Sequence, residues 1–382
     1  MTKVYCFFSA GYPPYLGGVE RYTYNLANKL TAMGNKVIIV TSQIGDDPIH
    51  EKKEEAEIYR LPSLRLLNGR FPVVIYNKAT QKILKKLKEK SIDYIIVNTR
   101  FYLLSYVGTK FASKNHISSI VIEHGTGHFT VNNRVLDFAG HLYEHLISLL
   151  VAGNTKKFYG VSLECNKWLK HFGITAKGVL YNAIDEKQIA DLCKNQNKEI
   201  EAKIKYNDDD IIITFTGRLI KEKGILKLLA MFEEVKRKYS NAKLCIAGDG
   251  ELYNYILNQH CEGVYLLGKL TFDNVIGLLR ITSIFCFPTD YPEGLPTSVL
   301  EAAACRNYII TTKFGGSKEV IIDKSYGVIM DKNDIKEIET KIIEAIEDKQ
   351  MRVTAADKLY NRVINEFTWA NTAQNLIKAF EE

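Results

Sequence analysis

Short apolar runs with the composition of β-strands alternate with amphipathic helical segments along this chain, and the whole alternation occurs twice. In the first half the expected strands are Val4–Phe8, Lys36–Thr41, Asp93–Asn98, Ser118–Ile122 and Lys157–Val161. Helical patterns follow Gly18, Phe71 and Tyr102. Because strands that alternate with helices form parallel sheets covered on both faces, this half predicts a doubly wound α/β domain.

The second half repeats the pattern from residue 211 onward. Its expected strands are Ile211–Thr216, Lys243–Ala247, Val264–Leu267, Ser283–Phe287, Tyr308–Thr311 and Gly327–Met330, with a helix over Gly224–Tyr239. A chain of 382 residues also exceeds the size at which one hydrophobic core keeps growing. We therefore predict two Rossmann-like domains, 1–180 and 181–366, connected through the polar stretch 194–210 and facing a central cleft where ligands would bind.

Composition and charge indicate the cellular setting. The seven cysteines include no CxxC pair and several lie in apolar runs, which predicts buried thiols in a reducing compartment. No signal peptide is recognised, and no run approaches the roughly 18 apolar residues of a transmembrane helix, so we expect a cytoplasmic protein with at most peripheral membrane contact. Residues 1–180 carry 24 Lys and Arg against 13 Asp and Glu, so the total of +7 leaves −4 for residues 181–382. This asymmetry suits an anionic surface or substrate on the first domain, while a solvated lysine-rich face explains it equally well.

Two candidate loops follow strands of the first half. The segment 9–21 brings the adjacent glycines Gly17 and Gly18 to the start of a helix, where backbone N–H groups can approach an anion, although a tight structural turn would look the same. The segment 123–128 places His124 at a strand end, where it could hydrogen-bond a sugar hydroxyl or a reacting group. A metal site made by His124 and His128 is not favoured, because the glycines between them argue against a helix and no third ligand is evident.

The segment 216–224 places two cations, Arg218 and Lys223, between a strand and a helix. Such cations suit a diphosphate because they neutralise the charge that develops on a leaving group. A solvated basic turn is the alternative. The glycine turn 248–250 and the acidic run 208–210 are interpreted as turn and surface features, and the acidic run as no metal site.

The segment 287–304 carries the strongest signal. It runs from a buried strand through a loop shaped by proline and glycine into an alanine-rich helix, with Pro296 suited to the first turn. Glu293 then lies in the loop and Glu301 in the helix, and the backbone N–H groups of 294–297 are available to a phosphate. The alternative, with Glu293 near the helix cap and Glu301 on the surface, does not explain the ordered loop.

Taken in order, these segments resemble the retaining glycosyltransferases of family four, a GT-B group that includes bacterial capsular and surface-polysaccharide enzymes. The resemblance spans nearly the whole chain, through GGVER (17–21), HG (124–125), GRL with KG (217–224), AGDG (247–250), the glutamates at 293 and 301, GG with Glu319 (315–319) and FTW (367–369). Two departures, Ala183 in place of a usual glycine and the sequence Cys-Arg-Asn-Tyr at 305–308, affect loops and not the diphosphate site.

The resemblance implies roles for individual residues. Arg218 and Lys223 would bind the donor diphosphate, Glu293 the donor sugar and Glu301 the ribose. Catalytic roles fall on His124, Arg218, Lys223 and Glu293, and donor binding on Gly17, Gly18, Gly217, Lys269, Gly294, Leu295, Pro296, Thr297 and Glu301. The segment 367–382 would cross back to the first domain.

The implied reaction moves a sugar from a nucleotide diphosphate sugar, expected to be a UDP-sugar, to a hydroxyl with retention of configuration. No metal or other cofactor is expected, and no nucleic-acid partner. The expected acceptor is a glycan or a polyprenyl-diphosphate-linked sugar in surface-polysaccharide assembly, with Arg60, Arg65, Arg70 and the lysines of 82–90 suited to an anionic membrane. The alternatives are a sugar-nucleotide epimerase of the same fold and a non-catalytic nucleotide-sugar-binding subunit, although the latter would be expected to lack some of the four charged residues.

Overall fold

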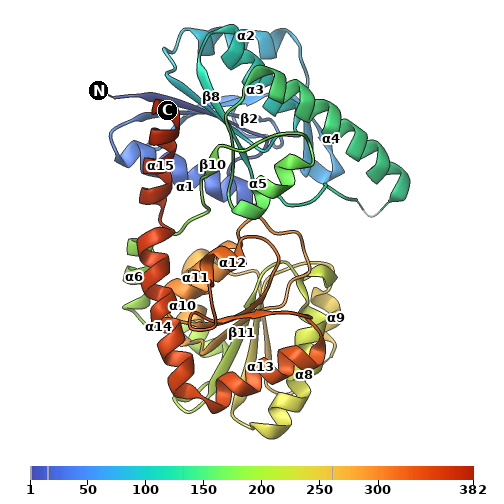
Figure 1. Cartoon of the computed structure of the whole chain (residues 1–382), viewed down its shortest axis with the longest axis vertical. Helices are drawn as coiled ribbons and strands as arrows, with labels where there is room; N and C mark the ends of the chain where they lie inside the picture. The colour runs from blue at the N-terminus through green and yellow to red at the C-terminus, as the bar shows by residue number, and fades with distance from the viewer. Residues whose placement is uncertain (1, 15–16, 132, 260) are drawn as a thin grey trace. The chain divides into compact units, whose positions relative to one another are not determined.

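The computed structural model describes residues 2–14, 17–131, 133–259 and 261–382, and shows two compact units (Figure 1). Unit 1 consists of residues 1–182 and 369–382, and unit 2 of residues 183–368. The expected domain limits were 1–180, 181–366 and 367–382, so the chain passes between the units within two residues of each expected position.

Unit 1 is built on an eight-stranded sheet with the order β10-β9-β8-β7-β1-β2-β4-β3. Its strands are β1 (Val4–Ser9), β2 (Lys36–Ser42), β3 (His50–Lys52), β4 (Glu57–Leu61), β7 (Tyr94–Asn98), β8 (Ser118–Glu123), β9 (Phe158–Gly160) and β10 (Gly178–Val179). All neighbouring strands pair in parallel except β3 with β4. The central strands are buried, which explains why they are nearly continuous apolar runs instead of alternating ones.

Helices cover this sheet. They are α1 (Gly18–Ala32), α2 (Lys78–Lys88), α3 (Leu103–Lys114), α4 (Arg134–Asn154), α5 (Leu163–Lys170) and α15 (Trp369–Glu381). The last helix, α15, comes from the far end of the sequence and lies beside α1 (Figure 1). Its Trp369 ring lies 5.2 Å from that of Tyr22, and its Phe380 ring 4.4 Å from that of Tyr94, so α15 completes the core of unit 1.

Unit 2 has a six-stranded, fully parallel sheet with the order β13-β12-β11-β14-β15-β16. The strands are β11 (Ile211–Thr216), β12 (Ala242–Ala247), β13 (Val264–Gly268), β14 (Ile284–Phe287), β15 (Tyr308–Thr312) and β16 (Val328–Met330). Its helices are α6 (Glu186–Cys193), α7 (Lys198–Lys203), α8 (Ile225–Lys238), α9 (Tyr253–Leu257), α10 (Phe272–Ile281), α11 (Thr297–Ala304), α12 (Ser317–Val320), α13 (Ile335–Glu347) and α14 (Lys349–Glu366). Every strand expected in this half is present.

Two expectations about connecting segments were wrong. The stretch 194–210 is no connection between domains, because α6 and α7 on either side of its first residues pack against α10 inside unit 2. The region 50–74, where no strand was predicted, contains β3, β4 and a hairpin of β5 (Ser63–Leu66) and β6 (Phe71–Val74) joined by a short 3-10 turn. Arginine and glutamate within these short strands hide their β character. The helix expected after Phe71 begins at Lys78.

One helix bears on the expectation about membrane-spanning segments. By length and composition alone, helix α4 could cross a bilayer, and 22% of the relevant window is buried inside the fold. Three charged residues and two histidines interrupt the apolar residues of α4, which concealed the helix from a search for uninterrupted runs. Of the seven cysteines, all free thiols, four are buried and three are partly exposed, so the prediction of buried thiols holds for four.

Candidate active site

The strand order of unit 2 reverses between β11 and β14. From β11 the chain proceeds outward through β12 and β13, then returns to place β14 on the opposite side of β11. The loops after two strands diverge at such a point and leave a crevice at their carboxyl ends, where doubly wound sheets bind ligands. The two loops are 217–224 and 288–296, which hold Arg218, Lys223 and Glu293.

Two glycines hold the backbone around these loops in close contact. Gly224 has φ +75°, and a Cβ there would overlap the carbonyl oxygen of Pro288. Gly315 has φ +64°, and a Cβ there would lie 2.6 Å from the carbonyl oxygen of Glu293. Only glycine fits both the left-handed backbone and this close approach. The amide of Asp290 also donates to the Glu222 carbonyl at 2.7 Å, so the two loops are fixed to each other.

Lys223 and Glu293 form an ion pair between these loops. The ammonium of Lys223 binds Oε1 of Glu293, and the two side chains are only 9% and 13% exposed. The Thr289 hydroxyl also donates to Oε1 of Glu293, at 3.4 Å. The Lys223 ammonium lies 5.0 Å from the ring centre of Tyr291 and 5.1 Å from that of Phe287. The sequence assigned the lysine and the glutamate to different parts of a ligand, whereas the structure brings them together.

The other cations and glycines of the predicted site lie nearby or at the neighbouring strand ends. Arg218 is exposed, with its guanidinium 5.0 Å from the ring centre of Tyr291. Gly217 directly follows β11, and its amide donates to the Ala247 carbonyl at 3.0 Å. Lys269 is exposed directly after β13. All three therefore lie at the carboxyl edge of the sheet.

Helix α11 begins at Thr297, with Pro296 as its N-cap residue. Gly294 and Leu295 lie in the loop before it, and the Gly294 carbonyl accepts from the Gly316 amide at 2.7 Å. Glu301 is 5% exposed, so the alternative that it is a surface residue is wrong. The first turn of α11 leaves backbone N–H groups next to Glu293, an arrangement that suits a phosphate.

In unit 1 the strand order reverses between β1 and β7, and His124 lies near this point. Its Nε2 is 2.9 Å from Oδ1 of Asn98 at the end of β7. The Asn98 amide group donates to Thr23 Oγ1 at 2.7 Å, and that hydroxyl donates to the Val19 carbonyl at 2.8 Å. Because the amide oxygen of Asn98 can only accept, His124 carries its proton on Nε2 and keeps a lone pair on Nδ1. Burial lowers the pKa of His124 to about 4, which keeps the ring neutral.

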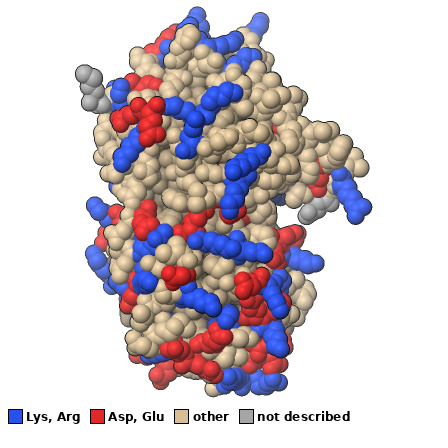
Figure 2. All heavy atoms as spheres, viewed as in Figure 1, with Lys and Arg blue, Asp and Glu red and all other residues tan. Residues whose placement is uncertain are grey.

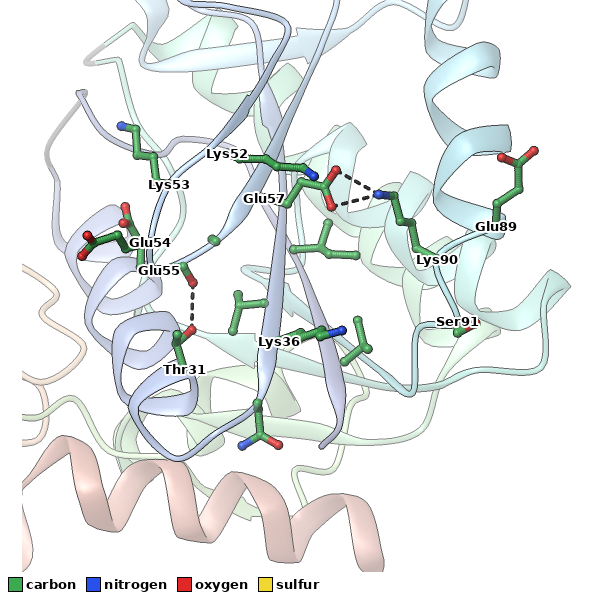
Figure 3. Close-up of a pocket in the computed structure, with 15 residues that line it drawn as sticks. Thr31, Lys36, Lys52, Lys53, Glu54, Glu55, Glu57, Glu89, Lys90 and Ser91 are labelled. Carbon is green, nitrogen blue, oxygen red and sulfur yellow. Dashed lines mark hydrogen bonds and ion pairs between the residues drawn. The ribbon is translucent and has the colours of Figure 1, made fainter. Parts of the chain in front are cut away.

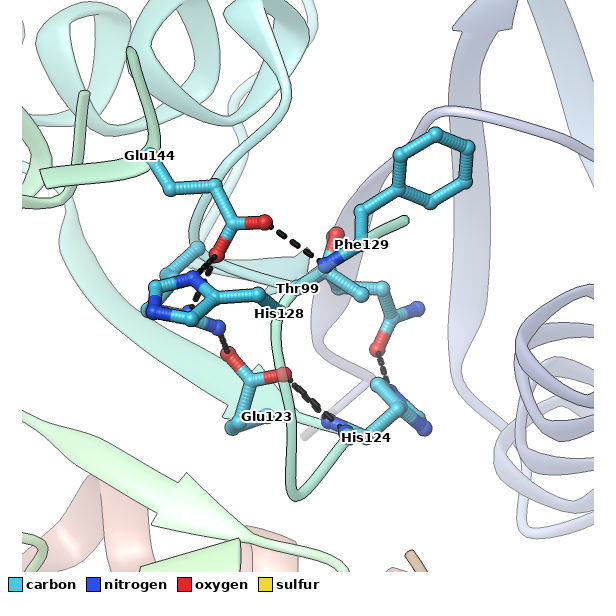
Figure 4. Close-up of polar contacts among 9 residues, drawn as sticks. Thr99, Glu123, His124, His128, Phe129 and Glu144 are labelled. Atoms are coloured by element: carbon cyan, nitrogen blue, oxygen red, sulfur yellow. Dashed lines mark hydrogen bonds and ion pairs between the residues drawn. The ribbon is translucent and has the colours of Figure 1, made fainter. Parts of the chain in front are cut away.

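A buried charge network lies beside His124 (Figure 4). Arg100 donates to Glu123 at 2.6 Å and to Glu144 at 2.9 Å, and the three side chains are 1 to 3% exposed. Oε1 of Glu123 accepts from the amides of His124 and Gly125, at 3.1 and 3.0 Å. The sequence analysis assigned no role to Arg100, Glu123 or Glu144. The available signal was a charged residue at or just after the end of two apolar strands, Arg100 after β7 and Glu123 in β8.

The glycine pair lies at the start of α1, with Gly17 as its N-cap residue. The carboxyl group of Glu20 packs against Gly11 and Gly17, where Cβ atoms would overlap it. Burial raises the pKa of Glu20, and hydrogen bonds from the backbone of Glu20 and Gly17 oppose that shift. Glu20 therefore caps the helix from its third residue, and its carboxyl group accepts from the Gly17 backbone in this structure. Tyr15 and Leu16 of this predicted loop lie outside the described residues.

A hollow of about 680 Å³ lies at the opposite, amino-terminal edge of the unit 1 sheet (Figure 3). It is lined by the first residues of β1, β2 and β4 and by mixed charges, among them Glu57, which accepts from Lys90 at 3.0 Å through both oxygens. The predicted site residues lie at the carboxyl ends of strands, where such sheets bind ligands. The hollow lies at the opposite edge and is therefore separate from them. Among the described residues, the histidines spaced to hold a metal ion are His128, His145 and His171, and His124 does not belong to that group.

The two units and their switch-point sites define a glycosyltransferase of the GT-B fold. Anabaena HepE, solved with UDP, superposes with a TM-score of 0.76 at 15% identity, covering 100% of both chains. A family model described as Glycosyltransferase Family 4 matches residues 16–188, and one described as Glycosyl transferases group 1 matches residues 196–362. This chain belongs to glycosyltransferase family four and is an enzyme of that class.

Two relatives show the extent of the sequence similarity. An uncharacterised glycosyltransferase of Methanocaldococcus jannaschii is 23% identical over 389 residues, which covers 98% of this chain and 97% of the relative. The capsular polysaccharide biosynthesis glycosyltransferase CapM of Staphylococcus aureus is 30% identical over 179 residues, which covers 45% of this chain and 46% of CapM.

Proposed function

We propose that this enzyme transfers a glycosyl group from a UDP-sugar to a hydroxyl of a lipid-linked glycan in surface-polysaccharide assembly, with retention at the anomeric carbon. The observation that carries the proposal is the Lys223–Glu293 pair beside the first turn of α11, at the switch point of unit 2. The complex of HepE with UDP supports a uridine donor, and the likeness to CapM supports the polysaccharide role.

Diphosphate binding would change the partner of Lys223. In the structure its charge is balanced by Glu293, and a buried carboxylate without a partner is costly. A donor that brings two phosphates supplies the anion for Lys223 and, through its sugar hydroxyls, the donors for Glu293. Arg218 and the backbone N–H groups of α11 add further stabilisation of the charge that develops on the departing diphosphate. This pair is therefore suited to recognise the diphosphate and the sugar together.

His124 would accept a hydrogen bond from a sugar hydroxyl. Its Nδ1 lone pair is fixed by the chain of hydrogen bonds through Asn98 and Thr23, which act as positioning residues. A neutral histidine is suited to orient a hydroxyl and poorly suited to donate a proton to the leaving group. In this proposal the acceptor hydroxyl gives its proton to a phosphate oxygen of the donor, on the same face of the sugar from which the diphosphate departs. The transfer needs neither a metal nor a protein nucleophile.

The reaction is tested with a panel of nucleotide sugars, with and without a polyprenyl-diphosphate-linked sugar acceptor. We expect diphosphate release only when donor and acceptor are both present, with UDP-sugars preferred over GDP-sugars. The anomeric configuration of the product, determined by NMR, should match that of the donor. Conversion of the donor without acceptor would instead indicate an epimerase, and binding without any turnover a non-catalytic subunit.

A surface on unit 1 supports contact with an anionic bilayer on the cytoplasmic side. One face of α4 exposes an apolar stripe with helical spacing, in which every side chain is more than half exposed: Val135, Phe138, Leu142, Leu146 and Leu149. Figure 2 shows the projecting end of this helix with few charged side chains. The β5–β6 hairpin lies beside α4, since the ring of Phe71 is 5.7 Å from that of Tyr143, and it exposes Arg65 and Arg70.

This surface has the apolar face and flanking cations that bind anionic lipid. Arg60 is not part of it, contrary to expectation, because its side chain is 3% exposed and pairs with Glu51 at 2.6 Å. Replacement of Leu142, Leu146 and Leu149 by serine should abolish flotation with phosphatidylglycerol vesicles. The matched control replaces Ile335 and Val353, exposed apolar residues of unit 2, by serine. Equal flotation of both variants would overturn the membrane proposal without touching the transfer reaction.

A further inference from the structure

Half of the eight histidines of the chain gather in one cluster on unit 1, outside the proposed active site. His128 comes from the loop after β8, His141 and His145 from α4, and His171 from the end of α5. The ring centres of His128 and His171 are 5.2 Å apart, and those of His145 and His171 are 5.0 Å apart. Three segments that are distant in sequence thus converge through one residue type.

The cluster has the spacing of a metal site. One ligand atom from each of His128, His145 and His171 lies within 4.8 Å of the other two. Tetrahedral zinc with bonds of about 2.0–2.1 Å holds its nitrogen ligands roughly 3.4 Å apart, so ligand atoms within 4.8 Å of one another need to approach by up to about 1.4 Å. His145 and His171 are exposed, and rotation of their side chains provides this movement.

A buried carboxylate orients the third ring. Oε2 of Glu144 lies 3.0 Å from Nδ1 of His128, while Oε1 accepts from the Phe129 amide at 2.8 Å (Figure 4). The contact assigns the proton to Nδ1 and directs the lone pair of Nε2 away from the carboxylate. Histidine ligands of metals are commonly held in this way by a carboxylate behind them. Simple aromatic packing would not need such a contact.

We propose that His128, His145 and His171 bind a divalent transition-metal ion of the zinc type, with water or His141 as the fourth ligand. The ion would connect the loop after β8 to α4 and α5. Through Glu144, which also binds Arg100, it would hold in place the network that supports His124. The site takes no part in the transfer chemistry, so it does not depend on the proposed reaction.

The test uses the full chain after removal of metal with a chelator. Calorimetric titration with Zn²⁺ should show one ion per chain, and Co²⁺ should give the intense visible absorption of a tetrahedral site. The double variant His145→Asn/His171→Asn changes two exposed residues and should bind Zn²⁺ at least 100-fold more weakly. His116→Asn, an exposed histidine outside the cluster with φ +56°, is the matched control.

Thermal unfolding provides a second measurement that is independent of activity. Zn²⁺ should raise the Tm of the wild type and of His116→Asn, and leave that of the double variant unchanged. The metal-free proteins should all unfold at similar temperatures, which establishes that the double variant is folded. Binding without a fixed stoichiometry, or equal affinity in the double variant and the wild type, would overturn the site and leave these histidines as a packing cluster.

Discussion

The two units use the same architectural position in different ways. At the switch point of unit 1, His124 is neutral and held by Asn98 and Thr23 in a chain of hydrogen bonds. At the switch point of unit 2, Lys223 and Glu293 neutralise each other as a charged pair. The first arrangement fixes one hydrogen-bond acceptor, the Nδ1 of His124, in a single orientation. In the second, Lys223 can exchange Glu293 for an incoming anion. The comparison separates a positioning site from a charge-binding site.

The largest expected effect tests the charged pair. Lys223→Met removes the diphosphate partner and leaves Glu293 partly buried without its cation, so kcat/KM should fall by about 10²- to 10³-fold and stability by about 3–5 kcal/mol. Lys221→Met, on the same short turn but exposed, is the control. The double variant Lys223→Met/Glu293→Gln should regain stability in urea unfolding and not activity. Recovery of activity in that variant would mean that the pair is structural only.

The next prediction tests the neutral histidine. Asn98→Asp places a carboxylate 2.9 Å from His124 Nε2, which stabilises the imidazolium and raises the histidine pKa. Protonation removes the Nδ1 lone pair, so kcat/KM should fall by about 10-fold or more as pH drops through the raised pKa. Histidine NMR titration and a pH–rate profile measure the two effects. An unchanged profile with a shifted pKa would exclude His124 from the reaction.

A smaller effect is expected on nucleotide affinity alone. Glu293→Gln removes the charge that competes with phosphate for Lys223 while the amide keeps the shape of the side chain. UDP should bind about 5- to 10-fold more tightly to this variant in calorimetry, which corresponds to about 1 kcal/mol, even though transfer becomes slower. The control is Asp290→Asn. Asp290 lies in the same loop as Glu293, but its carboxylate pairs with Lys227 of α8. Weaker UDP binding by Glu293→Gln would contradict the exchange of partners.

The last prediction concerns stability and pH. The pKa of His124 is about 4 in the folded protein, below the ordinary value of 6.5. The unfolded chain therefore binds this proton first, and the stability from neutral His124 is complete above pH 6.5 and is lost as pH falls toward 4. In that window His124 contributes at most about 1.4 kcal/mol per pH unit to the slope of the unfolding free energy. Urea unfolding of wild type and His124→Gln at several pH values should show a shallower slope in the variant.

The sequence predicted the fold well because the pattern of apolar residues along the chain follows directly from which side chains are buried. Every strand expected in both halves exists, since the central strands of parallel sheets are apolar on both faces. Strands β3 to β6 escaped because they are only three to five residues long and their apolar residues are mixed with charged ones, among them Glu57, Arg60 and Arg65. Their hydrophobic signal is too short and too mixed to distinguish from a loop.

The candidate site was predicted as a set of residue types but not as a set of contacts. Glycines, cations and glutamates after strands identified the loops that the structure brings together at the switch point of unit 2. Lys223 and Glu293 are 70 residues apart in the sequence. Their pairing depends on the conformations of two loops, which residue patterns do not determine. The capping role of Glu20 and the Arg100 network likewise depend on which backbone atoms come close in space.

The return of α15 to unit 1 has a consequence for the order of synthesis. Unit 2 is complete once residue 368 has emerged from the ribosome, but unit 1, begun first, still lacks its last helix. Until residues 369–382 have been synthesised, Trp369 and Phe380 cannot cover Tyr22 and Tyr94. Domains usually fold from the amino terminus during translation, whereas here the first unit must finish last. A chain truncated before residue 369 would thus carry a finished second unit on an incomplete first one.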